Sequence, residues 1–291
     1  MNRVLSELKW FIRVFLTKLG IKRQYRIGNI YIELDYTHRL PDYQSSHAYY
    51  DSFLPHLAKH LPSKGLVIDV GANVGDTLVG MIDANENLEY VCIEADKGFF
   101  DDLSKNIKTI KAQVPNANVH AVNVFVGKEL NNVYLEGSNG TKHAVIGAGD
   151  IESQPLDKVL KDIGLDAKLS LLKTDVDGFD YDVIRSSENL LSDCPLIYFE
   201  CQYENVDQLN GYKSLFRELI ERGYSSFVFF DNFGQYIAEL GAVEQLNSLL
   251  GYVARQNLGR GTRTFYYYDI LAFDEDKREF VNGVIKDYVT N

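Results

Sequence analysis

The sequence lacks several features that would place it in large classes of proteins. It has only three cysteines, Cys92, Cys194 and Cys201, and none of them forms a CxxC pair or has a histidine at zinc-ligand spacing. We therefore expect small buried thiols in a reducing compartment. No apolar run reaches the ~18 to 20 residues needed to cross a bilayer, and no small-residue cleavage site follows the N-terminal segment. The sequence thus predicts neither a transmembrane helix nor a signal peptide.

A surplus of positive charge is absent as well. The net charge is −11, which argues against nucleic acid as the main partner. The balance is uneven, because residues 1–26 hold seven Lys or Arg and a single acid, Glu7. That segment carries +6 and the remainder of the chain −17. A basic end on an acidic body indicates a separate role for that end.

Internal repeats and low-complexity tracts are also missing, and 291 residues fit one large α/β domain with additions or two small domains. From residue 65 onward, apolar strand-like runs alternate with amphipathic helical patterns. The alternation predicts a doubly wound, Rossmann-like α/β fold with a mostly parallel, seven-stranded sheet covered on both faces. The expected strands span 66–70, 90–94, 119–124, 169–175, 196–200, 225–230 and 265–273. The expected helices span about 76–84, 97–110, 155–163, 179–190, 212–222 and 236–250.

The first 62 residues follow a different pattern. Residues 3–20 predict a basic amphipathic helix, because five apolar residues recur at helical spacing: Val4, Leu8, Phe11, Phe15 and Leu19. An extended stretch at 31–34, an aromatic segment at 36–50 and a helix at 49–60 follow. We therefore expect an N-terminal extension over 1–62, with the helix and an aromatic cap, and a main α/β domain over 63–291.

A cofactor cradle is expected where the first strand of the main domain ends. The strand runs from Val67 into the turn at Gly71, and a helix starts near Asp76. Glycine lets the backbone pass close to a ligand, and the helix N-terminus offers unpaired N–H groups that suit a carboxylate such as the methionyl end of SAM. The expected cradle residues are Asp69, Gly71, Asn73, Gly75 and Asp76.

Glu94 ends the second expected strand, 23 residues beyond Gly71. An acid at this place can accept hydrogen bonds from both ribose hydroxyls of a nucleoside cofactor. NAD-binding folds use the same device, but their GxGxxG fingerprint needs a glycine at position 73, where this chain has Asn73. The turn therefore favours SAM, which has no pyrophosphate to cradle.

The chain resembles the FkbM-type methyltransferases in three motifs that occur in the same order. They are Asp69-Val-Gly-Ala-Asn-Val-Gly-Asp76, Ile93-Glu94-Ala95 and Leu172-Lys-Thr-Asp-Val-Asp-Gly178. The family pattern reads roughly DVGANxG, a glutamate at strand two and KxDxEG, so Asp177 stands where the family usually has Glu. The resemblance covers about residues 65–230. It implies a class I, SAM-dependent methyltransferase domain, usually an O-methyltransferase acting on sugars or other secondary metabolites, and it does not name the substrate.

Methyl transfer to a hydroxyl requires alignment of the acceptor with the methyl group and a base that takes the hydroxyl proton. That base should lie at the carboxyl ends of the strands. Asp175 at the tip of the fourth strand and Asp177 in the following loop are the candidates, and either could instead hold acceptor hydroxyls. An equal alternative for Asp177 is a cap on the helix expected near Phe179. No metal is expected, because nothing marks a third ligand beside the two carboxylates.

Further polar residues have two interpretations each. His143, in a loop after the third strand, is a catalytic candidate or an ordinary surface histidine, and Glu200 is another acid expected to face the crevice or a solvated loop. His56 and His60 have metal-ligand spacing, but without a nearby carboxylate motif a solvated helix face is favoured. A group of tyrosines could form a lid over a sugar or a domain cap: residues 36, 43, 49 and 50. A group of arginines could form a phosphate site or belong to an exposed loop: Arg255, Arg260 and Arg263.

These features predict a SAM-dependent O-methyltransferase that modifies a hydroxyl of a glycan, nucleotide-sugar or lipid-linked saccharide. The alternatives are an NAD-dependent oxidoreductase, which Asn73 disfavours, and a SAM-binding scaffold without turnover, which the fourth-strand carboxylates disfavour. We expect a cytoplasmic protein that can form homo-oligomers. Its residues 1–26 either hold it against the anionic inner membrane surface or pack on the catalytic domain or a second subunit.

Overall fold

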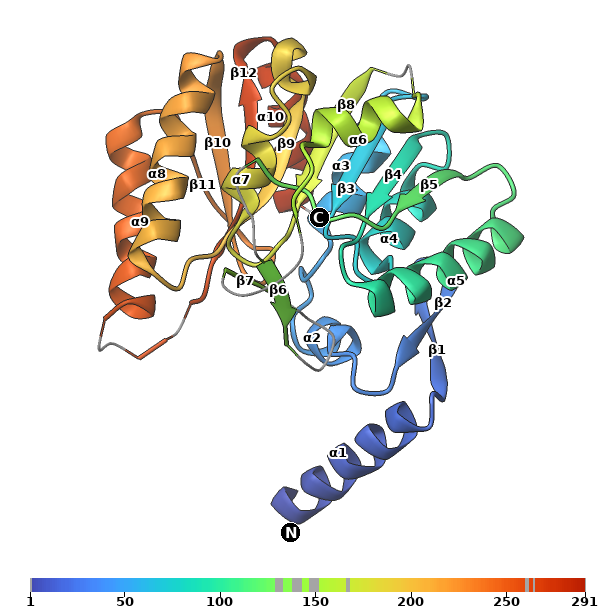
Figure 1. Ribbon diagram of the computed structural model, residues 1–291. Helices are drawn as coiled ribbons and strands as arrows, with labels where there is room; N and C mark the ends of the chain where they lie inside the picture. The colour runs from blue at the N-terminus through green and yellow to red at the C-terminus, as the bar shows by residue number, and fades with distance from the viewer. Residues whose placement is uncertain are drawn as a thin grey trace.

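A single eight-stranded sheet dominates the computed structural model, which describes residues 2–128, 133–137, 143–146, 152–165, 168–259, 262–263 and 265–290 (Figure 1). In spatial order the strands are β11 (Tyr236–Leu240), β10 (Tyr224–Asp231), β12 (Tyr268–Asp274), β9 (Leu196–Cys201), β8 (Leu169–Thr174), β3 (Leu66–Val70), β4 (Glu89–Ile93) and β5 (Asn118–Val122). Strands β9, β8, β3, β4 and β5 pair in parallel, whereas β12 runs antiparallel to β9 and β10, and β11 antiparallel to β10. The expected doubly wound, mostly parallel α/β fold is confirmed.

Helices cover both faces of this sheet. One layer consists of α3 (Phe53–His60), α4 (Asp76–Ala84), α5 (Lys97–Gln113) and α10 (Arg278–Thr290), and the other of α6 (Leu156–Ile163), α7 (Asp180–Arg185), α8 (Val206–Glu221) and α9 (Val243–Asn257). Side chains alternate along each strand, so β3 sends Val67 into the first layer and Ile68 into the second, and both are fully buried. Each face of the sheet therefore has its own apolar core.

The remaining elements are short, apart from the first helix. They are α1 (Asn2–Lys18), the hairpin of β1 (Lys22–Ile27) and β2 (Ile30–Asp35), α2 (Leu40–Ser46), the hairpin of β6 (Val133–Glu136) and β7 (His143–Ile146), and the 3₁₀ turns Leu190–Asp193 and Glu275–Lys277. Figure 1 shows α1 projecting away from the rest of the chain. No helix among the described residues is long and apolar enough to span a membrane.

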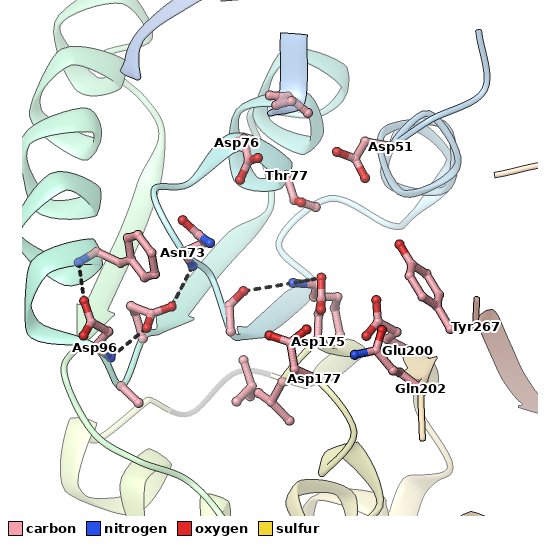
Figure 2. Close-up of a pocket in the computed structure, with 18 of the residues that line it drawn as sticks. Asp51, Asn73, Asp76, Thr77, Asp96, Asp175, Asp177, Glu200, Gln202 and Tyr267 are labelled. Carbon is pink, nitrogen blue, oxygen red and sulfur yellow. Dashed lines mark hydrogen bonds and ion pairs between the residues drawn. The ribbon is translucent and has the colours of Figure 1, made fainter. Parts of the chain in front are cut away.

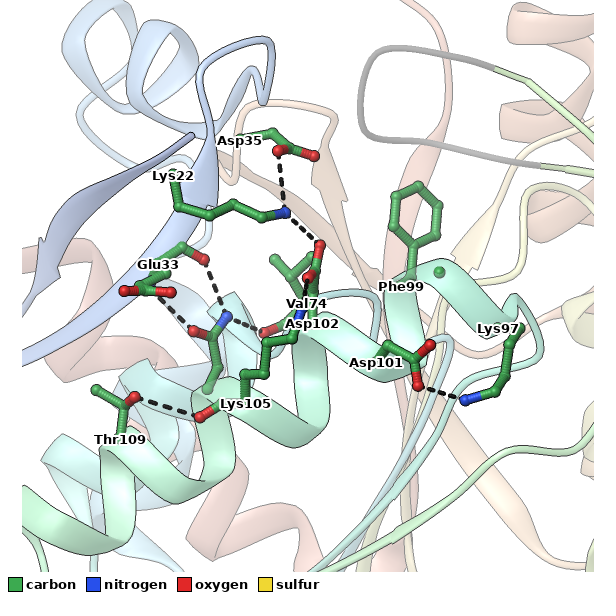
Figure 3. A network of polar contacts seen from close by, with 12 residues as sticks. Lys22, Glu33, Asp35, Val74, Lys97, Phe99, Asp101, Asp102, Lys105 and Thr109 are labelled. Atoms are coloured by element: carbon green, nitrogen blue, oxygen red, sulfur yellow. Dashed lines mark hydrogen bonds and ion pairs between the residues drawn. The ribbon is translucent and has the colours of Figure 1, made fainter. Parts of the chain in front are cut away.

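Polar contacts attach the β1–β2 hairpin to α5 (Figure 3). Lys22 Nζ lies 2.9 Å from Asp35 and 2.5 Å from Asp102 of α5. The buried side chain of Asn106 exchanges hydrogen bonds of 2.9 and 3.1 Å with the Glu33 backbone, and it donates a third to the carbonyl of Val74 at 2.9 Å. The hairpin is thus tied to the turn that follows β3. Ile30, Ile32 and Leu34 enter the same core cluster as α4 and α5, while the boundary at 62/63 stays a prediction.

The eighth strand is the main departure from the expected architecture. The sequence predicts a helix from residue 236, but Tyr236–Leu240 forms β11, and helix α9 begins only at Val243. The cause lies in the preceding turn, where the Asp231 carboxylate accepts the backbone N–H groups of Phe233 and Gln235, both at 2.9 Å. That turn reverses the chain, so β11 pairs with β10 as an edge strand.

Three helices differ from their expected ends. Helix α8 starts at Val206 rather than near 212, because the Asn205 side chain caps it through the N–H of Gln208 at 2.9 Å. Helix α3 starts at Phe53 rather than 49, since Asp51 adopts a left-handed conformation with φ +55°. The helix expected over 179–190 ends at Arg185, and a separate 3₁₀ turn follows.

Candidate functional site

A cavity of about 720 Å³ opens at the carboxyl ends of β3, β4, β8 and β9 (Figure 2). Its volume falls within the range of about 300–1,000 Å³ that is typical of small-molecule sites. It is lined by seven residues that the sequence named as cofactor-binding or acidic candidates: Gly71, Asn73, Asp76, Glu94, Asp175, Asp177 and Glu200. The topology therefore brings three separate sequence motifs to one crevice, as expected for an open α/β sheet.

The turn after β3 brings two strand tips into close contact. Gly71 has φ +79°, and a Cβ atom there would lie 1.9 Å from the carbonyl oxygen of Asp175 at the end of β8. Only glycine combines this conformation with this approach. Gly75 follows as the N-cap of α4, so the first N–H groups of that helix point toward the cavity, where Asp76 and Thr77 are part of the lining.

Glu94 shapes the other side of this turn. Its Oε2 atom accepts the N–H of Asn73 at 2.8 Å, and its Oε1 atom accepts the N–H of Asp96 at 2.7 Å. Burial raises the pKa of Glu94, and the two backbone N–H groups counteract this. Each carboxylate oxygen has a further lone pair, so Glu94 remains able to accept ribose hydroxyls.

Asp69 has a different position from the one expected. It is 1% exposed and does not line the cavity. Lys173 Nζ lies 2.8 Å from Asp69 Oδ1, 3.6 Å from Asp175 Oδ2 and 3.2 Å from the carbonyl oxygen of Gly71. Burial alone would lower the pKa of Lys173, but Asp69 and Asp175 outweigh it and raise that pKa. Asp69 therefore holds Lys173 in place at the cavity wall and does not itself line the cavity.

The two carboxylates after β8 differ in their surroundings. Asp175 is exposed to the cavity, whereas Asp177 is half-buried and has φ +51°. Burial raises the pKa of Asp177 to about 7, and the negative charge of Asp175 adds to the shift. The alternative role of Asp177 as a helix cap is wrong, because Phe179 occupies the N-cap position of α7 and no side chain caps that helix.

Three further acids join these two, and of them the sequence singled out only Glu200. Asp51 and Glu200 line the cavity together with Gln202 and Tyr267 (Figure 2). Asp269 lies in a smaller adjoining hollow. The pKa of Asp51 is raised to about 8, mainly by burial and further by the negative charges of Asp76 and Asp175. Glu200, already a candidate from the sequence, is 7% exposed, and burial raises its pKa well above the usual range.

Aromatic side chains form another part of the cavity wall. Tyr43 and Tyr50 both line the cavity, and their rings stack with centroids 5.0 Å apart. His47 stacks on Phe233 with centroids 3.8 Å apart, and both line the cavity as well. Two of the four tyrosines thus line the cavity, and their role as a lid or as a cap stays a prediction. Tyr49 instead packs edge-on against Tyr288, with centroids 5.9 Å apart.

Other candidates lie elsewhere. His143 begins β7, and its side chain is outside the described part of the structure. Arg260 is also outside the described residues, while Arg255 belongs to α9 and Arg263 lies 3.6 Å from Glu204. Cys92 and Cys201 are buried, as expected, and Cys194 is partly exposed.

The structure supplies a carboxylate beside His56 and His60 that the sequence did not indicate. Asp287 of α10 lies 3.7 Å from the Nε2 atom of each histidine. However, His56 Nε2 also lies 3.1 Å from the carbonyl oxygen of Val284. A carbonyl oxygen can only accept, so this nitrogen carries a proton and has no lone pair for a metal.

Comparison with known proteins assigns the class. The family model of the methyltransferase FkbM domain matches residues 69–226, more than half of the chain, so the chain belongs to the FkbM methyltransferase family. It is a SAM-dependent methyltransferase, and its fold is that of the class I enzymes. No curated protein matches the chain.

The similar solved structures are distant. A methyltransferase FkbM from Methylobacillus flagellatus KT is 11% identical with a TM-score of 0.39, over 81% of this chain and 59% of that one. An O-methyltransferase from Bacillus cereus in complex with SAH is 11% identical with a TM-score of 0.44, over 81% and 88%. A putative transferase from Pyrococcus horikoshii is 12% identical with a TM-score of 0.47, over 94% and 87%.

Proposed function

We propose that this methyltransferase transfers the methyl group of SAM to a hydroxyl of an uncharged sugar residue within a glycan. The observation that carries the proposal is the polar end of the cavity, where Asp51, Asp175, Asp177 and Glu200 converge with Gln202 and Tyr267. Glu200 is buried there, and its Oε1 atom has no hydrogen-bond partner within the described structure. Such a surface matches the several hydroxyl groups of a sugar ring.

The residues on the β4 side fit the cofactor. Glu94 would accept the ribose hydroxyls, and the N-terminal N–H groups of α4 would hold the methionyl carboxylate. Asp76, in the first turn of α4, would pair with the ammonium group. Bound in this way, SAM supplies an electrophilic methyl group. Asp175 then lies between the cofactor side and the polar end of the cavity.

The shifted pKa values separate the roles of the carboxylates. A general base must be ionised near neutral pH, and burial raises the pKa of Glu200 well above its usual range, which favours the protonated form. Glu200 would therefore donate a hydrogen bond to an acceptor oxygen. Asp175 is exposed to the cavity and is the leading candidate to take the hydroxyl proton as the methyl group is transferred. Asp177, with a pKa of about 7, is the alternative base.

The charge of the cavity argues against a phosphate at the transfer site. Among the described residues that line the cavity, the arginine and lysine side chains are those of Arg39 and Lys173. Lys173 is already paired with Asp69. Seven acids line the same cavity: Asp51, Asp76, Glu94, Asp96, Asp175, Asp177 and Glu200. The diphosphate of a nucleotide-sugar or a lipid-linked saccharide would have to lie away from this end, on the Arg39 side.

Transfer of labelled methyl groups from SAM to a panel of acceptors tests the proposal. The panel contains neutral oligosaccharides, the same sugars as nucleotide diphosphates, and sugars phosphorylated beside the free hydroxyl. We expect label in the first two groups and exclusion of the third. The Glu200→Gln variant should keep SAM binding and most activity, because an amide also donates a hydrogen bond, whereas Glu200→Leu should raise the acceptor KM. Label confined to the sugars phosphorylated beside the free hydroxyl would contradict the proposal.

A further inference from the structure

Helix α1 is attached to the rest of the chain through its polar face. The Arg13 guanidinium forms two hydrogen bonds with the Asp42 carboxylate of α2, at 2.6 and 3.0 Å. One turn further along, the Thr17 hydroxyl accepts the backbone N–H of Thr37 at 3.2 Å. Residues 13 and 17 lie on the same side of the helix, so this side faces the protein.

The opposite face carries large apolar side chains that remain in solvent. The side chains of Leu8, Phe11 and Phe15 are 55%, 67% and 53% exposed, and those of Ile12 and Leu19 are exposed as well. An amphipathic helix that packs on its own domain buries its apolar stripe and exposes its polar face. Here the arrangement is reversed, so the stripe does not pack on the catalytic domain, which removes one of the interpretations left open by the sequence.

The cations around the stripe indicate what covers it. Lys9 and Lys18 are exposed and flank the stripe on its two sides, and residues 1–26 carry +6 in total. A symmetric pairing with a second copy would bring two such segments together, and their like charges would repel. Large apolar side chains on one face with lysines along the edges are typical of helices that lie in the headgroup region of an anionic membrane.

We propose that α1 docks this protein on the surface of an anionic lipid bilayer, lying parallel to the membrane with Leu8, Phe11, Ile12, Phe15 and Leu19 inserted. The helix is joined to the active-site cavity through α2, because Asp42 holds Arg13 and the next residue, Tyr43, lines the cavity. Docking through α1 therefore brings the α2 side of the cavity toward the membrane. The inference does not depend on the acceptor proposed above.

Flotation of the full-length protein with lipid vesicles tests the docking. Vesicles of phosphatidylcholine alone are compared with vesicles that also contain phosphatidylglycerol, at low and at high salt. We expect flotation with the anionic vesicles at low salt and loss of binding as salt screens the lysines. The double variant Phe11→Ser, Phe15→Ser should lower the partition coefficient at least about tenfold. The variant Lys9→Glu, Lys18→Glu should lower it about 25-fold or more, from about fivefold for each cation lost.

Matched controls separate docking from folding and from self-association. Tyr252→Ser removes an aromatic ring of α9 that is 48% exposed, and it should float like the unmodified protein. Circular dichroism and SAM titration should show that all variants are folded. Failure of the unmodified protein to float, or equal flotation with phosphatidylcholine alone, would overturn the proposal. So would a dimer in sedimentation velocity that dissociates in the double phenylalanine variant while vesicle binding is unchanged.

Discussion

Replacing Gly71 with alanine tests the most confined point of the site. The new Cβ atom would lie 1.9 Å from the carbonyl oxygen of Asp175 and 2.9 Å from its carbonyl carbon. Both are backbone atoms at the tip of β8, and the N–H of Asp175 is hydrogen-bonded to Val70 of β3 at 3.0 Å. The methyl group therefore cannot be accommodated by rotating a side chain, and the two strand tips have to separate.

The expected loss in the free energy of unfolding has two parts, and comparison with a second glycine of the chain separates them. A left-handed backbone conformation costs an L-residue about 1–2 kcal/mol, and forcing extra atoms into a filled space costs about 1–3 kcal/mol more. Gly164 has φ +74°, close to the +79° of Gly71, but no heavy atom lies within 4 Å of its hypothetical Cβ. Gly164→Ala therefore carries only the first part. We expect losses of about 2–5 kcal/mol for Gly71→Ala and about 1–2 kcal/mol for Gly164→Ala.

Urea unfolding of the two variants and the unmodified protein measures both losses. Calorimetric titration with SAM then adds a second readout, because separation of the β3 and β8 tips displaces the turn around Asn73 and should weaken cofactor binding. Gly164→Ala, at the end of α6, should leave the SAM affinity unchanged. If Gly71→Ala costs no more stability than Gly164→Ala and binds SAM equally well, the close approach of the two strand tips is refuted.

Three further predictions concern the carboxylates. Glu94→Ala should weaken SAM binding by roughly 1.5–3 kcal/mol in a calorimetric titration, since it removes hydrogen bonds to a charged acceptor. Asp175→Asn should lower kcat by about 10² to 10⁴ in a labelled-methyl assay while the SAM dissociation constant stays the same, as expected for loss of a general base. The pKa of Asp51 is about 8 in the folded protein and about 4 in the unfolded chain, so the folded state retains a proton that the unfolded state loses between these pH values. The free energy of unfolding should therefore fall as pH rises from about 4 to about 8, and Asp51→Asn should reduce this fall in urea titrations at several pH values.

Exposed acids provide the controls for these experiments. Glu86→Ala should leave SAM binding unchanged, and Asp162→Asn should leave kcat and the pH dependence of stability unchanged. Normal SAM affinity in Glu94→Ala would remove the ribose assignment. Full turnover in Asp175→Asn would move the base to Asp177. An unaltered pH profile in Asp51→Asn would mean that other acids with raised pKa values, such as Asp269 or Glu200, dominate the titration.

Local sequence signals were sufficient to predict that Gly71, Asn73, Asp76 and Glu94 share one cavity, while their contacts with SAM stay a prediction. The strand entering Gly71, the helix from Asp76 and the acid at Glu94 lie within one strand–helix–strand unit, and such a unit has essentially one arrangement because its crossover connection is right-handed. The periodicity of apolar residues likewise predicted seven of the eight sheet strands. The edge strand β11 escaped prediction because its side chains are exposed or half-buried, so no apolar pattern marks it.

Tertiary structure alone decided which residues join Asp175, Asp177 and Glu200 at the polar end of the cavity, and which way α1 faces. Asp51 and Tyr267 come from opposite ends of the chain, and the sheet order brings both to Glu200. The sequence established that α1 has an apolar and a basic face, because that depends only on the 3.6-residue repeat. Which face points outward depends on Asp42 and Thr37, long-range partners that fix Arg13 and Thr17 against the protein. Periodicity is a property of one segment, whereas orientation and convergence require the positions of segments relative to each other, and only the folded chain fixes those.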